Sequence, residues 1–269
     1  MEGATIDKAG APLPDADFAS IQRYVDAIVE GLAALHLSVT IETDFTALYR
    51  FLRTRPGAIV NSTFNPFESD LSRDSFWLRV VDADDNTVAC HAQRVFVVED
   101  FTELIRSGRL FSTIGQPCDP ARSQIVPPSR LIAGSVAYAG SLWVDVQYRK
   151  QGLSVWLPYL SRLACLRNYD LDFFTACVFE GLARSGVATK SYGYTHVEPV
   201  LRGIFPPTGT EATLFLCHST CGEAVDKIKL LAVHPQYPLD PDSAGGRPAR
   251  ETADVAGPGQ RVLRDGTGG

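Results

Sequence analysis

The sequence contains no apolar run near the length of about 20 residues that a membrane-spanning helix requires. Between Met1 and Pro14 it also lacks the basic start and apolar stretch of a secretory leader. These absences favour a cytoplasmic location and predict no membrane span. The sequence has 25 Lys and Arg residues and 31 Asp and Glu residues, which gives a formal net charge of -6. A broad phosphate-neutralising surface is not expected, so nucleic acid is not predicted as a partner.

Cysteine and histidine are too scattered to predict a metal site. The six cysteines lie mostly in apolar segments, which suits reduced core residues better than a disulfide framework. Cys217 and Cys221 enclose His218 in the closest cluster, but no second Cys/His pair has matching spacing. We therefore predict no metal.

The length and composition fit one large domain with extensions, because 269 residues with 45% hydrophobic content can bury a sizeable core. We predict a flexible N-terminus over 1–14, a single domain over 15–232 and a disordered tail over 233–269. The tail is rich in Pro, Gly, Asp and Arg and has almost no apolar clustering. Within the domain, 15–36 is a helical extension and 99–133 is an inserted segment.

Hydrophobic periodicity predicts alternating strands and helices along the domain. Helices are expected from Asp15 or Asp17, from Asp44, over 101–107, after Gly152 and around 180–190, and strands over 37–43, 76–81, 88–98, 135–146, 173–178, 195–205 and 212–218. The order strand 135–146, helix, strand 173–178 is a β-α-β unit, which favours parallel pairing of the two strands.

The run from Leu142 to Ser154 is the segment most indicative of chemistry. A strand is expected to end near Val146, Gly152 would allow the backbone to approach a ligand closely, and a helix would begin immediately afterwards. Several unpaired amides and the positive helix end can hold a pyrophosphate. Arg149 and Lys150 add charge beside it. We therefore predict an anion-binding turn here.

This run resembles the GNAT acetyltransferase superfamily signature L-x-V-x-P-x-x-R-x-x-G-x-G/A. Leu142, Val144, Arg149 and Gly152 match it, while Val146 replaces the proline and Ser154 replaces the last small residue. The resemblance implies an α/β (α+β) fold with a mixed, mostly antiparallel sheet of six or seven strands. A central parallel pair, strands four and five, would splay apart, with helices on both faces. The order of predicted elements over 37–219 agrees.

The resemblance implies an acyl-CoA-dependent N-acyltransferase, which transfers acetyl from acetyl-CoA to a primary amine by direct attack. Acetyl-CoA or another acyl-CoA would be the co-substrate, with no metal. The acceptor would be a small-molecule or peptide amine, and a homodimer is left open. The implied CoA-binding residues are Leu142, Val144, Val146, Arg149, Lys150, Gln151, Gly152, Leu153 and Ser154.

The resemblance also indicates the positions at which catalytic groups would lie. At the strand position where family members often carry a Glu or His base, this chain has Tyr138, a poor base because its reference pKa is about 10. His91 and Glu198 are alternatives, with His91 better suited by its titration range. The family's thiolate-protonating tyrosine corresponds to Thr189, which leaves Tyr192 as the nearest phenol. Tyr138, His91 and Tyr192 are therefore the catalytic candidates.

Three other functions remain open from the sequence. One is transfer of a long acyl chain from acyl-CoA or acyl carrier protein, with 99–133 shaping a pocket. Another is a catalytically silent CoA-binding module, which Tyr138 at the base position permits. A hydrolase using Cys217 and His218 is disfavoured, because neighbouring residues in a strand point to opposite faces.

Overall fold

The computed structural model of the chain describes residues 15–56, 58, 61–71, 73–111 and 117–233. The flexible N-terminus predicted over 1–14 lies outside the described residues, as does the predicted tail beyond residue 233. Among the described helices, none is long and apolar enough to cross a membrane.

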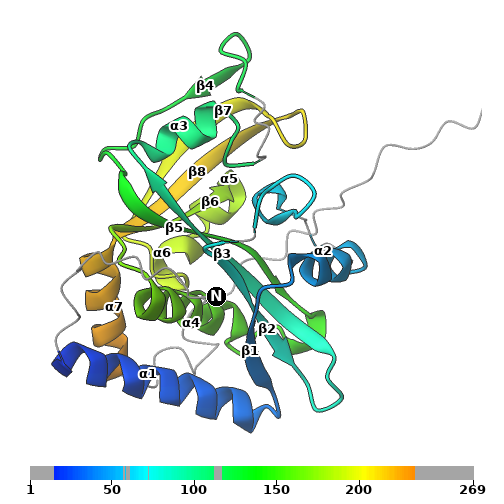
Figure 1. Cartoon of the computed structure of the whole chain (residues 1–269), viewed down its shortest axis with the longest axis vertical. Coiled ribbons are helices and arrows are strands. Elements are labelled where there is room, and N and C mark those ends of the chain that lie inside the picture. The colour runs from blue at the N-terminus through cyan, green and yellow to red at the C-terminus, as the bar shows by residue number, and fades with distance from the viewer. Residues whose placement is uncertain (1–14, 57, 59–60, 72, 112–116, 234–269) are drawn as a thin grey trace, which may run out of the picture.

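One mixed sheet forms the centre of the fold, with strand order β1-β2-β3-β5-β6-β8-β7-β4 (Figure 1). Its eight strands are β1 Ser38–Glu42, β2 Ser75–Val81, β3 Thr87–Val98, β4 Ser123–Ile125, β5 Gly134–Val144, β6 Phe173–Phe179, β7 His196–Phe205 and β8 Thr210–Thr220. Neighbouring strands are antiparallel except for the β5–β6 pair, which is parallel as predicted. The expected count of six or seven strands is too low, because the inserted segment contributes β4, which pairs with β7 at the sheet edge.

Helices cover both faces of the sheet, as the fold class requires. They are α1 Asp15–Ala34, α2 Phe45–Arg53, α3 Phe101–Arg106, α4 Leu153–Asn168, α5 Glu180–Arg184, α6 Val187–Lys190 and α7 Cys221–Val233, with 3-10 helices η1 Ser62–Phe64 and η2 Val146–Tyr148. One hydrophobic cluster joins α1, α4 and α7 through Ile28, Leu157 and Ile228. A second, on the opposite face, includes Leu48 of α2 and Ile105 of α3.

Local capping explains the helix starts that the sequence predicts. The Asp44 carboxylate accepts hydrogen bonds from the backbone N–H groups of Thr46 and Ala47, at 2.9 and 3.0 Å. Asp100 accepts from the Thr102 N–H at 2.8 Å. Such caps satisfy amides that have no partner inside the helix. The predicted starts of α2 and α3 are confirmed.

Two predicted boundaries differ from the structure. The single helix expected over 180–190 is two short helices, because Gly186 between them adopts φ 74°, the left-handed conformation that ends a helix. The strand expected to reach Val146 ends at Val144, because the Asp145 carboxylate accepts from the Gln147 N–H and begins η2.

Helix α7 was missed by the sequence prediction, which placed only the end of the core near Leu231. Its start is a capping box, in which the Glu223 carboxylate accepts from the Thr220 N–H and the Thr220 hydroxyl accepts from the Glu223 N–H. The pattern Thr-x-x-Glu was therefore the available signal.

Substituting Gly193 by alanine should destabilise the chain by about 2 kcal/mol or more, because an added Cβ would overlap the Tyr159 hydroxyl and φ is +72°. Gly209→Ala is the matched control, since Gly209 has φ +66° but nothing within 4 Å of an added Cβ. Urea unfolding measures both. If both variants lose the same unfolding free energy, the close packing of Gly193 against Tyr159 does not contribute to stability.

Candidate active site

The parallel strands β5 and β6 separate partway along their length. Their pairing runs from Val136 with Phe173 to Ala139 with Ala176. In the described chain no pairing of these strands follows, although β5 continues to Val144 and β6 to Phe179. Ser141, at φ 51°, lies in an irregularity of the β3–β5 register. Such bulges bend a strand, so the end of β5 has backbone groups with no partner on β6.

Helix α4 begins close to the end of β5. Its N-cap is Gly152, with φ +88° and no side-chain cap hydrogen bond, so no side chain covers the first-turn amides. Arg149, Lys150 and Ser154 are exposed around this end. The Arg149 Nε donates to the Val144 carbonyl at 3.2 Å, which ties the basic side chain to the end of the strand. The predicted turn is thus an uncapped helix end flanked by two cations.

Gly152 also has a packing role. An added Cβ would lie 2.8 Å from the ring of Trp156, which is buried in the α4 face of the core. Any substitution at Gly152 would therefore disturb the packing of Trp156 as well as the binding of a ligand. A test of ligand binding must use another position.

A cavity of about 590 Å³ opens at the separated strand ends. Ser141, Leu142 and Trp143 of β5 and Cys177 and Phe179 of β6 line one side. The remaining walls come from α2, the connection after it, Phe111, and the end of the β7–β8 hairpin, and they combine apolar and aromatic residues with polar ones. The cavity is on the α2 side of the sheet, opposite α4, as its contact with Tyr138 and Leu214 of the second cluster indicates.

Tyr138 lies in the cavity wall and is 1% exposed. Its ring stacks between Phe64 and Phe101, with both centroid distances 6.0 Å. Burial raises the pKa of the Tyr138 hydroxyl well above its usual value, Cys177 acts in the same direction, and a hydrogen bond with Asn61 opposes it. Tyr138 is therefore a protonated hydrogen-bond donor near neutral pH and not a base.

Replacing Tyr138 by phenylalanine should leave CoA binding unchanged and lower the unfolding free energy by about 1 kcal/mol, because the ring stack stays and one hydroxyl is lost. Calorimetric titration with CoA and urea unfolding measure the two effects. A loss of CoA affinity would contradict this assignment.

The other two catalytic candidates do not line the cavity. His91 is buried on the α4 face, where burial and then the Arg162 guanidinium lower its pKa to about 3, so it stays neutral. Tyr192 is half-buried on the same face, and burial followed by Cys217 raises its pKa. Of the three predicted catalytic residues, the structure brings only Tyr138 to the cavity.

Sequence reasoning missed the polar groups on the α2 side of the cavity. Glu68 is the one carboxylate among the described lining residues, and Asn65 Nδ2 donates to its Oε1 at 2.9 Å. Arg53 brings a cation to the same wall, where its Nη1 donates to the Tyr49 hydroxyl at 3.2 Å. The polar residues Asn61, Ser62, Asn65 and Glu68, in the segment that follows the close of the predicted helix at 55–57, were the signal that could have indicated this wall.

The Cys217–His218 pair does not form a nucleophile and base. Cys217 packs in the core cluster of the α4 face, where burial raises its pKa to about 12 although the Arg162 guanidinium acts in the opposite direction. His218 points to the opposite face, where its ring stacks on His196. The hydrolase alternative therefore has no geometric basis.

The strand order and the splayed parallel pair are those that the GNAT resemblance implies, so the fold is GNAT-like. Comparison of the sequence with protein-family models finds no match, and comparison with curated proteins finds none either. Solved structures with similar folds include Arabidopsis thaliana NAA60 in complex with acetyl-CoA, at 13% identity and TM-score 0.43, covering 69% of this chain and 99% of that chain. FeeM, an N-acyl amino acid synthase from uncultured soil microbes, is 11% identical with TM-score 0.45, and the match covers 74% of this chain and 97% of FeeM. The Vibrio cholerae spermidine N-acetyltransferase in complex with CoA and spermine is 10% identical with TM-score 0.41, and the match covers 71% of this chain and 98% of that chain.

Proposed function

We propose that the protein is an acyl-CoA-dependent N-acyltransferase. The observation that carries the proposal is that β5 and β6 stop pairing after Ala139 and Ala176, where a cavity opens on the α2 side of the sheet, while the uncapped N-terminus of α4 follows the end of β5 along the chain. Backbone groups left without a strand partner suit the amide-bearing pantetheine arm, and an uncapped helix end suits a pyrophosphate.

The predicted CoA-binding residues divide between these two parts. Leu142 and Val144 would offer backbone groups to the pantetheine arm. The amides of 151–154 would hold the pyrophosphate, with Arg149 and Lys150 beside it. Val146 belongs to η2 and is exposed, so we assign it no contact with the pantetheine arm.

The acceptor would be a primary amine that enters the cavity from the α2 side. Glu68, which lines the cavity, would accept the proton of the amine, whose nitrogen then attacks the thioester carbonyl, so that an amide bond forms and the carbon–sulfur bond breaks. The departing thiolate needs a proton. Tyr192 is our candidate proton donor, because its hydroxyl interacts with Cys217. Cys217 pairs with Ala176, the last residue of β6 that pairs with β5, so Tyr192 lies near the point where the two strands separate.

Transfer from acetyl-CoA is the simplest form of this activity, and transfer of a longer acyl chain is the second candidate. A cavity of about 590 Å³ greatly exceeds the space that an acetyl group fills. Phe111, Trp143 and Phe205 among its lining residues would stabilise an apolar chain.

Thermal unfolding with free CoA, acetyl-CoA and longer acyl-CoAs tests the proposal. A ligand that binds only the folded state stabilises it by about 2.7 kcal/mol at 100 times its Kd, so every CoA species should raise the Tm. A larger rise with longer chains would favour the second candidate. If no CoA species shifts the Tm, the proposal is wrong, and binding without thiol release on an amine panel would indicate a silent module.

A further inference from the structure

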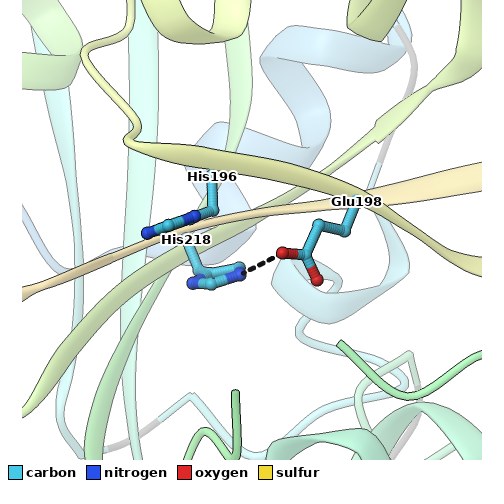
Figure 2. Close-up of side chains that lie close together, drawn as sticks. All are labelled: His196, Glu198 and His218. Atoms are coloured by element: carbon cyan, nitrogen blue, oxygen red, sulfur yellow. Dashed lines mark ion pairs between the residues drawn. The ribbon is translucent and has the colours of Figure 1, made fainter. Parts of the chain in front are cut away.

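Two histidines and a glutamate gather on one face of the β7–β8 hairpin, and none of the three is among the residues that line the cavity (Figure 2). His196 and His218 are direct partners in the antiparallel register, and their rings stack with centroids 4.8 Å apart. Glu198 is two residues beyond His196, so its side chain is on the same face. Figure 2 shows the Glu198 carboxylate turned toward His218, with Oε1 3.8 Å from Nε2.

His218 is the residue that most requires an explanation. Its side chain is 0% exposed, and in the described structure neither ring nitrogen has a hydrogen-bond partner. The 3.8 Å contact with Glu198 is too long for a hydrogen bond. Buried polar atoms are nearly always paired, so an imidazole without a partner indicates a ligand that the protein atoms do not supply.

The three side chains are the right kinds for a metal ion. One donor atom from each lies within 4.8 Å of the others. Two imidazoles and one carboxylate are a common set for zinc and other divalent first-row metals. Because the two rings stack at an interplanar angle of 14°, at least one ring would rotate to direct its nitrogen at a shared ion.

Neighbouring groups already hold the carboxylate of Glu198 in place. It accepts from the Ser129 N–H at 2.6 Å and from the Ser129 hydroxyl at 2.5 Å. Glu223 Oε1 lies 3.5 Å from His196 Nε2, and Arg130 pairs with Glu223 at 3.3 Å. Outer hydrogen bonds of this kind orient metal ligands.

We propose that His196, Glu198 and His218 bind one divalent transition-metal ion, with Zn²⁺ the best match, and that Glu223 or water completes its coordination. The site would fasten β7 to β8 and, through Ser129, fasten the segment before β5 to the sheet. It is independent of the proposed acyltransferase function. The sequence predicted no metal because it offered only the local Cys-His-x-x-Cys spacing, whereas these ligands are brought together by strand register.

Metal analysis of the chain purified after zinc supplementation tests this site. We expect about one Zn²⁺ per chain, and X-ray absorption should show nitrogen and oxygen ligands at about 2.0–2.2 Å. Chelation should lower the Tm, and added Zn²⁺ should restore it. Substoichiometric zinc with no effect of chelation, or sulfur ligands from Cys217 or Cys221, would overturn the proposal.

Variants separate this site from other histidines. His196→Gln and Glu198→Gln should each weaken Zn²⁺ affinity by about tenfold or more, whereas His36→Asn, which removes an exposed histidine before β1, should leave it unchanged. Equal Zn²⁺ affinity in all three would overturn the assignment. The wild-type metal content and absorption spectrum decide the question even if a variant fails to fold.

Discussion

Ser154→Glu should weaken CoA binding by about 100-fold while the chain stays folded. Ser154 is exposed in the first turn of α4, where a phosphate would approach the free amides. A carboxylate there repels the phosphates, and the repulsion between two negative charges a few ångströms apart near a surface amounts to several kcal/mol. The same carboxylate interacts favourably with the helix N-terminus, which stabilises the free protein by about 0.3–1 kcal/mol.

These opposite effects make the variant informative, because lost binding cannot then be attributed to unfolding. Ser154→Ala is the control, since it keeps a small side chain and should retain CoA affinity within about threefold. Calorimetric titration with CoA and thermal unfolding measure the two quantities. Unchanged CoA affinity in Ser154→Glu would place the phosphates elsewhere.

Glu68→Gln should lower kcat/KM for the amine by about 100-fold or more while acyl-CoA still binds. A glutamine keeps the shape and can still contact Asn65, but it cannot accept the amine proton, and general base catalysis contributes about 10²–10⁴ to rate. Thiol release at saturating acyl-CoA, with a parallel CoA titration, separates the two steps.

Glu30→Gln is the control for this change, because Glu30 is an exposed carboxylate on α1, on the other face of the sheet. It should leave both measurements unaltered. If Glu68→Gln retains full kcat/KM, another group takes the proton. If it loses acyl-CoA binding instead, the cavity wall at Glu68 belongs to the donor site and not to the acceptor site.

The features that the sequence predicted are those that local chemistry determines. Asp44 and Asp100 each cap a helix within three residues along the chain. The apolar run of β6 and the helix that precedes it define a β-α-β unit, which fixes the parallel pairing with β5. The turn at Gly152 was predictable because its left-handed conformation and the helix start are encoded within a few residues.

The features that the sequence missed depend on contacts between distant segments. Glu68 joins the site only because the connection after α2 folds across the ends of β5 and β6. His196 meets His218 through the register of a hairpin, which the sequence pattern did not specify. His91 had the right chemistry, but the pleat of β3 directs it to the α4 face, where burial keeps it neutral. Residue type therefore predicted candidates, and strand geometry selected among them.

Hydrogen–deuterium exchange with and without CoA tests the central claim most directly. If the splayed strands hold the pantetheine arm and α4 holds the pyrophosphate, CoA should slow exchange of the amides over 142–144 and 151–154. The His196–His218 hairpin pair should exchange at the same rate in both states. Absence of protection at the ends of β5 and α4, or protection confined to another part of the chain, would contradict the account.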